Sequence, residues 1–149
     1  MVTLEDILID YSIGCGVATS IAISFNDNKS DSNNNPFVRY AFGLGWHGAR
    51  QIGFLTVRNA RLSSLGDGVP VSVIQRTGAG WWGLLYDEFM HSDDHRLMTF
   101  ATLGSLVPGA YRSYTGTFIV NANISRSSEL DLTDAIVLDG HVTMTIHYL

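Results

Sequence analysis

The chain has 149 residues, a length that fits one domain, and 46% of them are apolar, which is enough for a hydrophobic core and argues against a disordered protein. The net charge is −5 at pH 7 and the nine Lys and Arg residues are scattered, which argues against a nucleic-acid partner. No apolar run reaches the roughly 18 residues that a membrane-spanning helix needs, and acidic residues stand at the N-terminus where a signal peptide carries positive charge.

Apolar side chains recur at every second position, which predicts β-strands because side chains alternate between the two faces of a strand. The first strand carries one apolar face: Ile7, Ile9, Tyr11, Ile13 and Cys15. The pattern continues after Gly16, over Ile21–Phe25. The stretch Asn26–Pro36 is rich in Asn, Asp and Ser, which predicts a solvated loop.

Five further strands are predicted, and the fifteen glycines fall between the strands as turn residues would. They cover Gln51–Arg58, Val69–Gln75, Leu97–Leu103, Thr115–Ile124 and Gly140–Leu149. One apolar face is especially regular: Phe118, Val120, Ala122 and Ile124. A short helix over Tyr86–His91 is an alternative. About seven strands without a long helix predict a single all-β domain over residues 1–149, as an antiparallel sandwich or barrel.

The last predicted strand alternates over its whole length. One face carries Leu138, Gly140, Val142, Met144, Ile146 and Tyr148, and the other carries Asp139, His141, Thr143, Thr145 and His147. This strand could lie inside a sheet, paired on both sides. Alternatively, it could border a groove that a strand of another protein fills, because an open edge recruits other chains. The pattern alone leaves both alternatives open.

Three stretches, taken in their order along the chain, resemble pilin-like proteins encoded beside bacterial chaperone–usher systems, several of which are classified only as a domain of unknown function. The closing stretch comprises Leu130–Leu132 and Ile136–Leu149. Ile13–Cys15 with Ile21–Phe25 is similar to the strand that carries the second cysteine of the pilin disulfide. The middle of the domain is represented by Phe42–Gly45, Gln51–Phe54 and Gly68–Ile74.

The resemblance implies an incomplete immunoglobulin-like sandwich that lacks one strand. In such pilins a periplasmic chaperone fills the groove first, and the N-terminal extension of the next subunit fills it afterwards. The expected function is that of a structural subunit of a surface fimbria, assembled through the periplasm with a chaperone, an usher and other subunits. The residues expected to contact the chaperone or the next subunit are Leu138, Val142, Met144, Ile146, Tyr148 and Leu149, with the Leu149 carboxylate held by basic chaperone residues.

The sequence departs from the family in three respects, since the signal peptide, the N-terminal extension and an earlier cysteine are absent. Cys15 therefore lacks the partner that the resemblance implies. We expect the natural chain to be longer at its N-terminus. We also expect the isolated domain to be unstable, or to form a strand-swapped homo-oligomer, unless a complementing strand is supplied.

Carbohydrate binding at a fimbrial tip is the alternative function on the same scaffold. Trp46, Trp81 and Trp82 could stack on sugar rings, with Arg50, Asp87 and Glu88 holding hydroxyl groups. Adjacent tryptophans in a strand point to opposite faces, so at least one of Trp81 and Trp82 is expected to be exposed.

Two other patterns are assigned to loops. The stretch from His91 to His95 is the densest group of metal-ligand side chains, but its spacing matches no known site, so no metal or cofactor is expected. Gly43, Gly45 and Gly48 match a G-x-G-x-x-G pattern, yet a strand is predicted to follow where a dinucleotide site needs a helix. His141 and His147 are expected to face solvent, and no catalytic residues are predicted, so the chain is not expected to be an enzyme.

Overall fold

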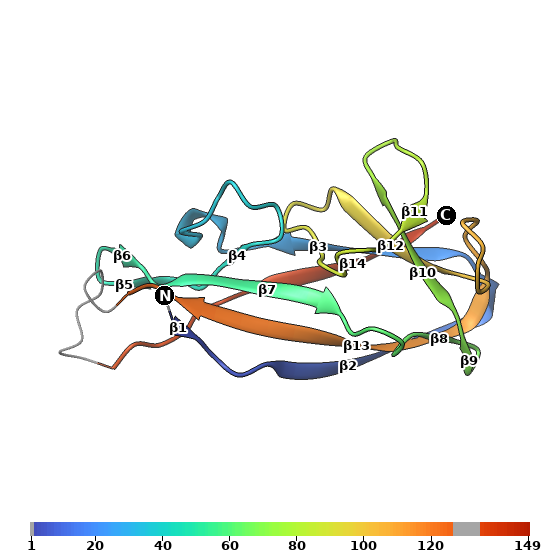
Figure 1. The fold of residues 1–149 in the computed structure, drawn as a ribbon, viewed down its shortest axis with the longest axis horizontal. Helices are drawn as coiled ribbons and strands as arrows, with labels where there is room; N and C mark the ends of the chain where they lie inside the picture. The colour runs from blue at the N-terminus through green and yellow to red at the C-terminus, as the bar shows by residue number, and fades with distance from the viewer. Residues whose placement is uncertain (1, 127–134) are drawn as a thin grey trace.

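The computed structural model describes residues 2–126 and 135–149, and its regular structure is almost entirely antiparallel β (Figure 1). The only helical element among these residues is a single 3-10 turn, η1 (Ser30–Ser32). The stretch Leu130–Leu132, which contributes to the pilin resemblance, lies outside the described residues. None of the described residues forms a helix with the length and apolar character that crossing a bilayer requires.

Two main sheets form the molecule, which fits an all-β sandwich. The seven-stranded sheet contains β1 (Val2–Thr3), β2 (Ile7–Thr19), β4 (Phe42–Gly43), β7 (Gly53–Asn59), β8 (Leu65–Gly66), β9 (Val69–Pro70) and β13 (Tyr111–Ile124). The five-stranded sheet has the order β11 (Gly83–Leu84), β10 (Ser72–Thr77), β12 (Arg96–Ala101), β3 (Ile21–Asp27), β14 (Val142–Tyr148). A small hairpin pairs β5 (Trp46–His47) with β6 (Arg50–Gln51).

The long strand β13 organises the seven-stranded sheet. Its first ten residues pair with β2 along one side, and its later residues pair with β7 along the other. Phe118 of β13 stacks on Tyr11 of β2 at 4.4 Å and meets Phe25 of β3 edge to face at 5.0 Å. These ring contacts connect the two sheets, because Phe25 belongs to the five-stranded sheet. The predicted apolar face of β13 is confirmed: Phe118 is buried, and Val120, Ala122 and Ile124 pack against the core.

Tyr11 occupies space that a glycine leaves free on the neighbouring strand. Gly116 is its partner in β13, and a Cβ atom at Gly116 would lie 2.5 Å from the Tyr11 hydroxyl oxygen. The ring therefore covers the glycine, as aromatic residues commonly do across a strand pair. Burial raises the pKa of Tyr11 to about 12, so the phenol stays neutral at physiological pH.

Strands form in every region where the sequence predicts one, with shifts of up to four residues at several ends. Two predicted strands are each divided between two sheets: residues 51–58 fall in β6 and β7, and residues 69–75 fall in β9 and β10. The largest shift is in β13, which begins at Tyr111, four residues before the predicted start. The helix alternative over Tyr86–His91 is wrong: these residues form a bend and a bridge to β7.

The expectation of a solvated loop over Asn26–Pro36 is wrong in part, because several of its side chains are buried. The Ser32 hydroxyl oxygen accepts the N–H of Gly45, and the Asn33 amide donates to the Ala41 carbonyl. Both side chains are buried, so the loop folds back onto the end of the sandwich. Polar composition predicted solvent exposure here, but these side chains replace water with backbone partners.

The G-x-G-x-x-G pattern serves packing and turns. Gly43 lies so close to η1 that a Cβ atom would be 2.0 Å from the Lys29 carbonyl oxygen. Gly45 and Gly48 have φ values of 89° and 59°, which favour glycine, and Gly48 lies in the turn between β5 and β6. Strands precede and follow the pattern, so the helix that a pyrophosphate site requires is not there.

Candidate functional site

Among the described residues β14 is an edge strand, so they do not show the pairing on both sides that was the first of the two alternatives. It pairs with β3 from Val142, opposite Asp27, to Tyr148, opposite Ile21. No described residue pairs with its other side. A strand of seven residues with one free edge is long for an unprotected edge, because such edges recruit other chains.

The register with β3 decides which backbone groups of β14 are free. Asn28 donates its N–H to the His141 carbonyl at 2.9 Å, and Leu149 donates its N–H to the Ser20 carbonyl at 3.0 Å. In an antiparallel ladder, hydrogen-bonded pairs alternate with non-bonded pairs, so the odd-numbered residues of β14 bond to β3. The even-numbered residues direct their N–H and C=O groups to the free edge: Val142, Met144, Ile146 and Tyr148.

The same four residues carry the apolar side chains on the inner face of the strand. Met144, Ile146 and Tyr148 lie opposite core residues of β3, and directly paired residues point to the same face. Val142 packs partly against the core. The other three remain exposed, Met144 by 39%, Ile146 by 37% and Tyr148 by 82%. The inner face of β14 is therefore covered only near its start.

The strand β2 forms the facing edge of the seven-stranded sheet. Its odd-numbered residues share the face of buried Tyr11, yet Ile7 is 61% exposed and Ile9 is 49% exposed. In Figure 1, β2 runs along the lower margin, while β14 passes behind β7 and β13. We use the name open seam for the exposed apolar residues along the free edges of β2 and β14: Ile7, Ile9, Met144, Ile146 and Tyr148.

Both ends of β14 are anchored to the sandwich. Before the strand, the Asp139 N–H donates to the Leu44 carbonyl at 2.8 Å, and the Asp139 carboxylate pairs with Lys29 at 2.9 Å. After the strand, Leu149 is bonded to Ser20 and is 49% exposed. Leu138 precedes the strand and is 41% exposed. Of the residues expected to contact a chaperone or subunit, Leu138 thus lies outside β14, and Leu149 lies just beyond its end.

His147 connects β14 to its neighbours on the outer face of the five-stranded sheet. The buried Ser24 hydroxyl donates to the Asp94 carboxylate at 2.6 Å and lies 2.8 Å from His147 Nε2. Because the serine hydroxyl donates its hydrogen bond to the carboxylate, Nε2 of the imidazole must be the donor in the hydrogen bond to the serine oxygen. This order of groups differs from that of a nucleophilic triad, in which the imidazole accepts the serine proton. His147 is half-buried, so the expectation that it faces solvent holds only in part, whereas His141 is exposed.

The potential metal ligands between His91 and His95 are directed apart. Asp94 bonds to Ser24, and the Asp93 carboxylate accepts the N–H of His95. His91 is buried, and its Nδ1 has no hydrogen-bond partner among the described residues. Over residues 2–126 and 135–149, no group of three or more His, Cys, Asp or Glu side chains could hold a metal ion.

The burial of His91 predicts acid sensitivity. Burial, together with the positive charge of Arg96, lowers the pKa of His91, and the nearby Asp93 and Asp87 only partly offset this effect. His91 therefore binds a proton more readily in the unfolded chain than in the folded chain. As the pH falls below the unfolded pKa of about 6.5, this difference lowers the free energy of unfolding. Urea unfolding at about pH 7.5 and about pH 5 should show a smaller loss of stability in His91→Gln than in the unmodified chain. Equal losses would contradict this prediction.

The three tryptophans do not form one surface. Trp46 lies in β5 at one end of the long axis, whereas Trp81 and Trp82 precede β11 at the other end (Figure 1). Trp81 is 96% exposed, and the Trp82 ring lies 5.0 Å from the guanidinium of Arg76. The expectation that at least one of Trp81 and Trp82 is exposed is confirmed, although both lie in the loop between β10 and β11 and not in a strand. A glycan surface that combines all three rings is incompatible with this placement.

Cys15 is a free, half-buried cysteine on the inner face of β2, where it packs against the core.

Comparisons with protein-family models, with curated proteins and with solved structures find no significant match.

Proposed function

We propose that the chain is a structural subunit of a bacterial surface fimbria of the chaperone–usher type, and that its sandwich accepts a β-strand from a second polypeptide along β14. The observation that carries the proposal is the coincidence of two features on the same four residues. Val142, Met144, Ile146 and Tyr148 direct their backbone groups to the free edge and carry apolar side chains on the inner face, where the last three remain exposed.

An added strand would satisfy both features at once. Its backbone would pair with the free N–H and C=O groups of β14, which gives affinity for many sequences. Its alternate side chains would cover Met144 and Ile146 on one strand and Ile9 on the other. Burying apolar surface contributes about 25 cal/mol per Å², and the side-chain period of two residues would fix the register.

The identity of the partners rests on the pilin resemblance. On this proposal a periplasmic chaperone occupies the open seam first, and another pilus subunit replaces it at the usher. The chain would then function at the cell surface. The half-buried thiol of Cys15 is in the strand where the family carries its disulfide, so its position also supports the proposal.

Hydrogen exchange with and without a model strand tests the proposal. The probe is a peptide that alternates valine with threonine, and its control has the same composition with the valines consecutive. We expect the alternating peptide to slow the exchange of the Met144 and Ile146 amides and to raise Tm by a few degrees, because it binds only the folded chain. Slow exchange of these amides in the free chain, or equal effects of the two peptides, would overturn the proposal.

A further inference from the structure

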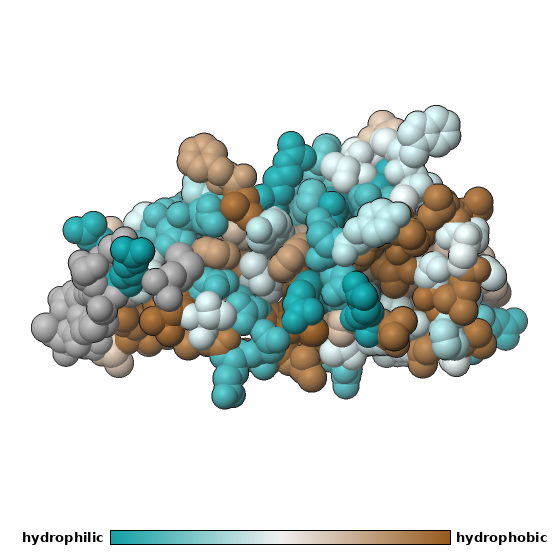
Figure 2. Space-filling view, in the orientation of Figure 1, coloured by the Kyte–Doolittle hydropathy of each residue, from teal (hydrophilic) through white to brown (hydrophobic). Residues whose placement is uncertain are grey.

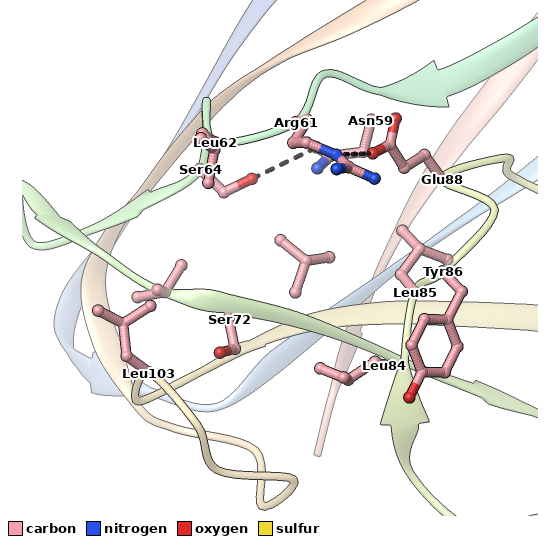
Figure 3. Close-up of a pocket in the computed structure, with 12 residues that line it drawn as sticks. Asn59, Arg61, Leu62, Ser64, Ser72, Leu84, Leu85, Tyr86, Glu88 and Leu103 are labelled. Carbon is pink, nitrogen blue, oxygen red and sulfur yellow. Dashed lines mark hydrogen bonds and ion pairs between the residues drawn. The ribbon is translucent and has the colours of Figure 1, made fainter.

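A pocket lies on the opposite side of the sandwich, at the β10–β11 edge of the five-stranded sheet. Figure 3 shows it between the segment after β7 and the strands β10 and β11. Its volume is about 290 Å³, at the lower end of the range of ligand pockets, which suits a ligand the size of a single ring. Its lining comprises Asn59, Arg61, Leu62, Ser64, Val71, Ser72, Val73, Leu84, Leu85, Tyr86, Glu88 and Leu103.

One wall of the pocket is polar and is electrically balanced. The Arg61 Nε atom donates to the Glu88 carboxylate at 2.8 Å, and a guanidinium nitrogen of Arg58 lies 3.8 Å from the same carboxylate. The Glu88 side chain is only 18% exposed. Asn59 and Ser64 lie on the same wall, as Figure 3 shows. Because Glu88 and Arg61 pair with each other, neither an anion nor a cation would find an unpaired opposite charge here.

The facing wall is mostly apolar. Val73 of β10, Leu84 of β11 and Val71, the residue before β10, line this wall. Leu103 closes one end (Figure 3). Tyr86 closes the other end with a ring that is 81% exposed. In Figure 2, apolar side chains gather at this right-hand end of the molecule, where Figure 1 places β8, β9 and β10.

Two residues at the rim adopt an unfavourable backbone conformation. Leu62 has a φ of 61° and Glu88 has a φ of 63°, values that residues other than glycine seldom adopt. Such conformations destabilise the folded chain and cluster at active sites and ligand-binding sites. Leu62 is also 95% exposed, so its own burial does not offset the cost.

We infer that this pocket binds one neutral sugar ring. A pyranose has an apolar C–H face and a rim of hydroxyl groups, which match the two walls of the pocket. Carboxylate and amide oxygens accept hydroxyl protons, while the free guanidinium nitrogens of Arg61 donate to hydroxyl oxygens. The exposed ring of Tyr86 offers an aromatic face to the sugar. This site is separate from the open seam, so the inference does not depend on strand acceptance.

An NMR titration of the full chain with glucose, galactose, mannose and N-acetylglucosamine tests the inference. We expect at least one sugar to cause saturable shifts in the amide signals of Ser72, Leu84 and Tyr86. Tyr86→Ala should weaken this binding about tenfold, the value of one aromatic contact. Leu103→Trp should abolish binding, because its larger side chain extends from an exposed position, 64% accessible, into the pocket.

Trp81→Ala is the matched control, since Trp81 is a fully exposed aromatic residue that does not line the pocket. Its affinity for the sugar should equal that of the unmodified chain. The inference is overturned if none of the four sugars shifts the pocket amides. It is equally overturned if the shifts centre on Trp81 and disappear only in Trp81→Ala. Melting curves of each variant show whether a loss of binding reflects a loss of folding.

Discussion

Thr145→Pro is expected to lower the free energy of unfolding by about 3 kcal/mol, because the substitution removes a backbone donor and leaves the facing carbonyl unpaired. Thr145 is an odd-numbered residue of β14 and lies opposite Ser24 of β3, so its N–H takes part in the ladder. Urea unfolding followed by fluorescence measures the change.

Met144→Pro is the matched variant at the adjacent position. The Met144 N–H points to the free edge, and proline is tolerated in edge strands where its nitrogen faces outward. We expect this variant to remain folded, with a loss of stability well below that of Thr145→Pro. If the free edge accepts a strand, Met144→Pro should also bind the alternating peptide at least tenfold more weakly, since one main-chain bond and one apolar contact are lost.

The two proline variants separate the contribution of β14 to stability from its ability to bind an added strand. Equal destabilisation by the two prolines would show that the hydrogen-bond alternation along β14 is assigned wrongly. Unchanged peptide affinity in a folded Met144→Pro variant would contradict strand addition at this edge. The circular dichroism spectrum of each variant confirms that its sheets are retained.

Gly43→Ala is expected to destabilise the chain by several kcal/mol or to prevent folding. Overpacking typically costs roughly 1–3 kcal/mol and occasionally more, and here the new atom would meet backbone. The new Cβ atom would lie 2.0 Å from the Lys29 carbonyl oxygen and 2.4 Å from the Ser32 hydroxyl oxygen. Gly43 is fully buried, so the contact can be relieved only if β4 moves away from η1. Thermal unfolding of purified protein gives the change in Tm.

Gly14→Ala is the control for this substitution. Gly14 lies in β2, and a Cβ atom there would meet nothing within 4 Å. We expect its stability to stay within about 0.5 kcal/mol of the unmodified chain, or to rise slightly because alanine restricts the unfolded state. If Gly43→Ala had the same Tm as Gly14→Ala, β4 and η1 would be packed more loosely than the structure indicates.

The strands could be predicted from the sequence because their signal is local. Alternating residues such as Ile7, Ile9 and Tyr11 specify a strand and its inner face without reference to any other part of the chain. The same holds for Phe118 and Val120 in β13. The face assignments are correct for both strands, since Tyr11 and Phe118 stack in the core.

The candidate site could be predicted only in part. Alternation placed Met144, Ile146 and Tyr148 on one face but could not decide whether β14 has one neighbour or two, since that depends on pairing with distant residues. The role of His147 was missed because its partners, Ser24 and Asp94, come from two other parts of the chain. The pocket beside Tyr86 also escaped prediction, because four separate segments line it and none carries a motif.

The pairing pattern also bears on how the chain folds. β2 obtains its partner only in β13, and β3 obtains its second neighbour only in β14, both near the other end of the sequence. During synthesis, the apolar faces of β2 and β3 therefore emerge long before the residues that cover them. Folds dominated by such distant pairings close slowly and expose aggregation-prone surface meanwhile. A protein that held β2 and β3 apart from other nascent chains during this interval would raise the yield of folded molecules.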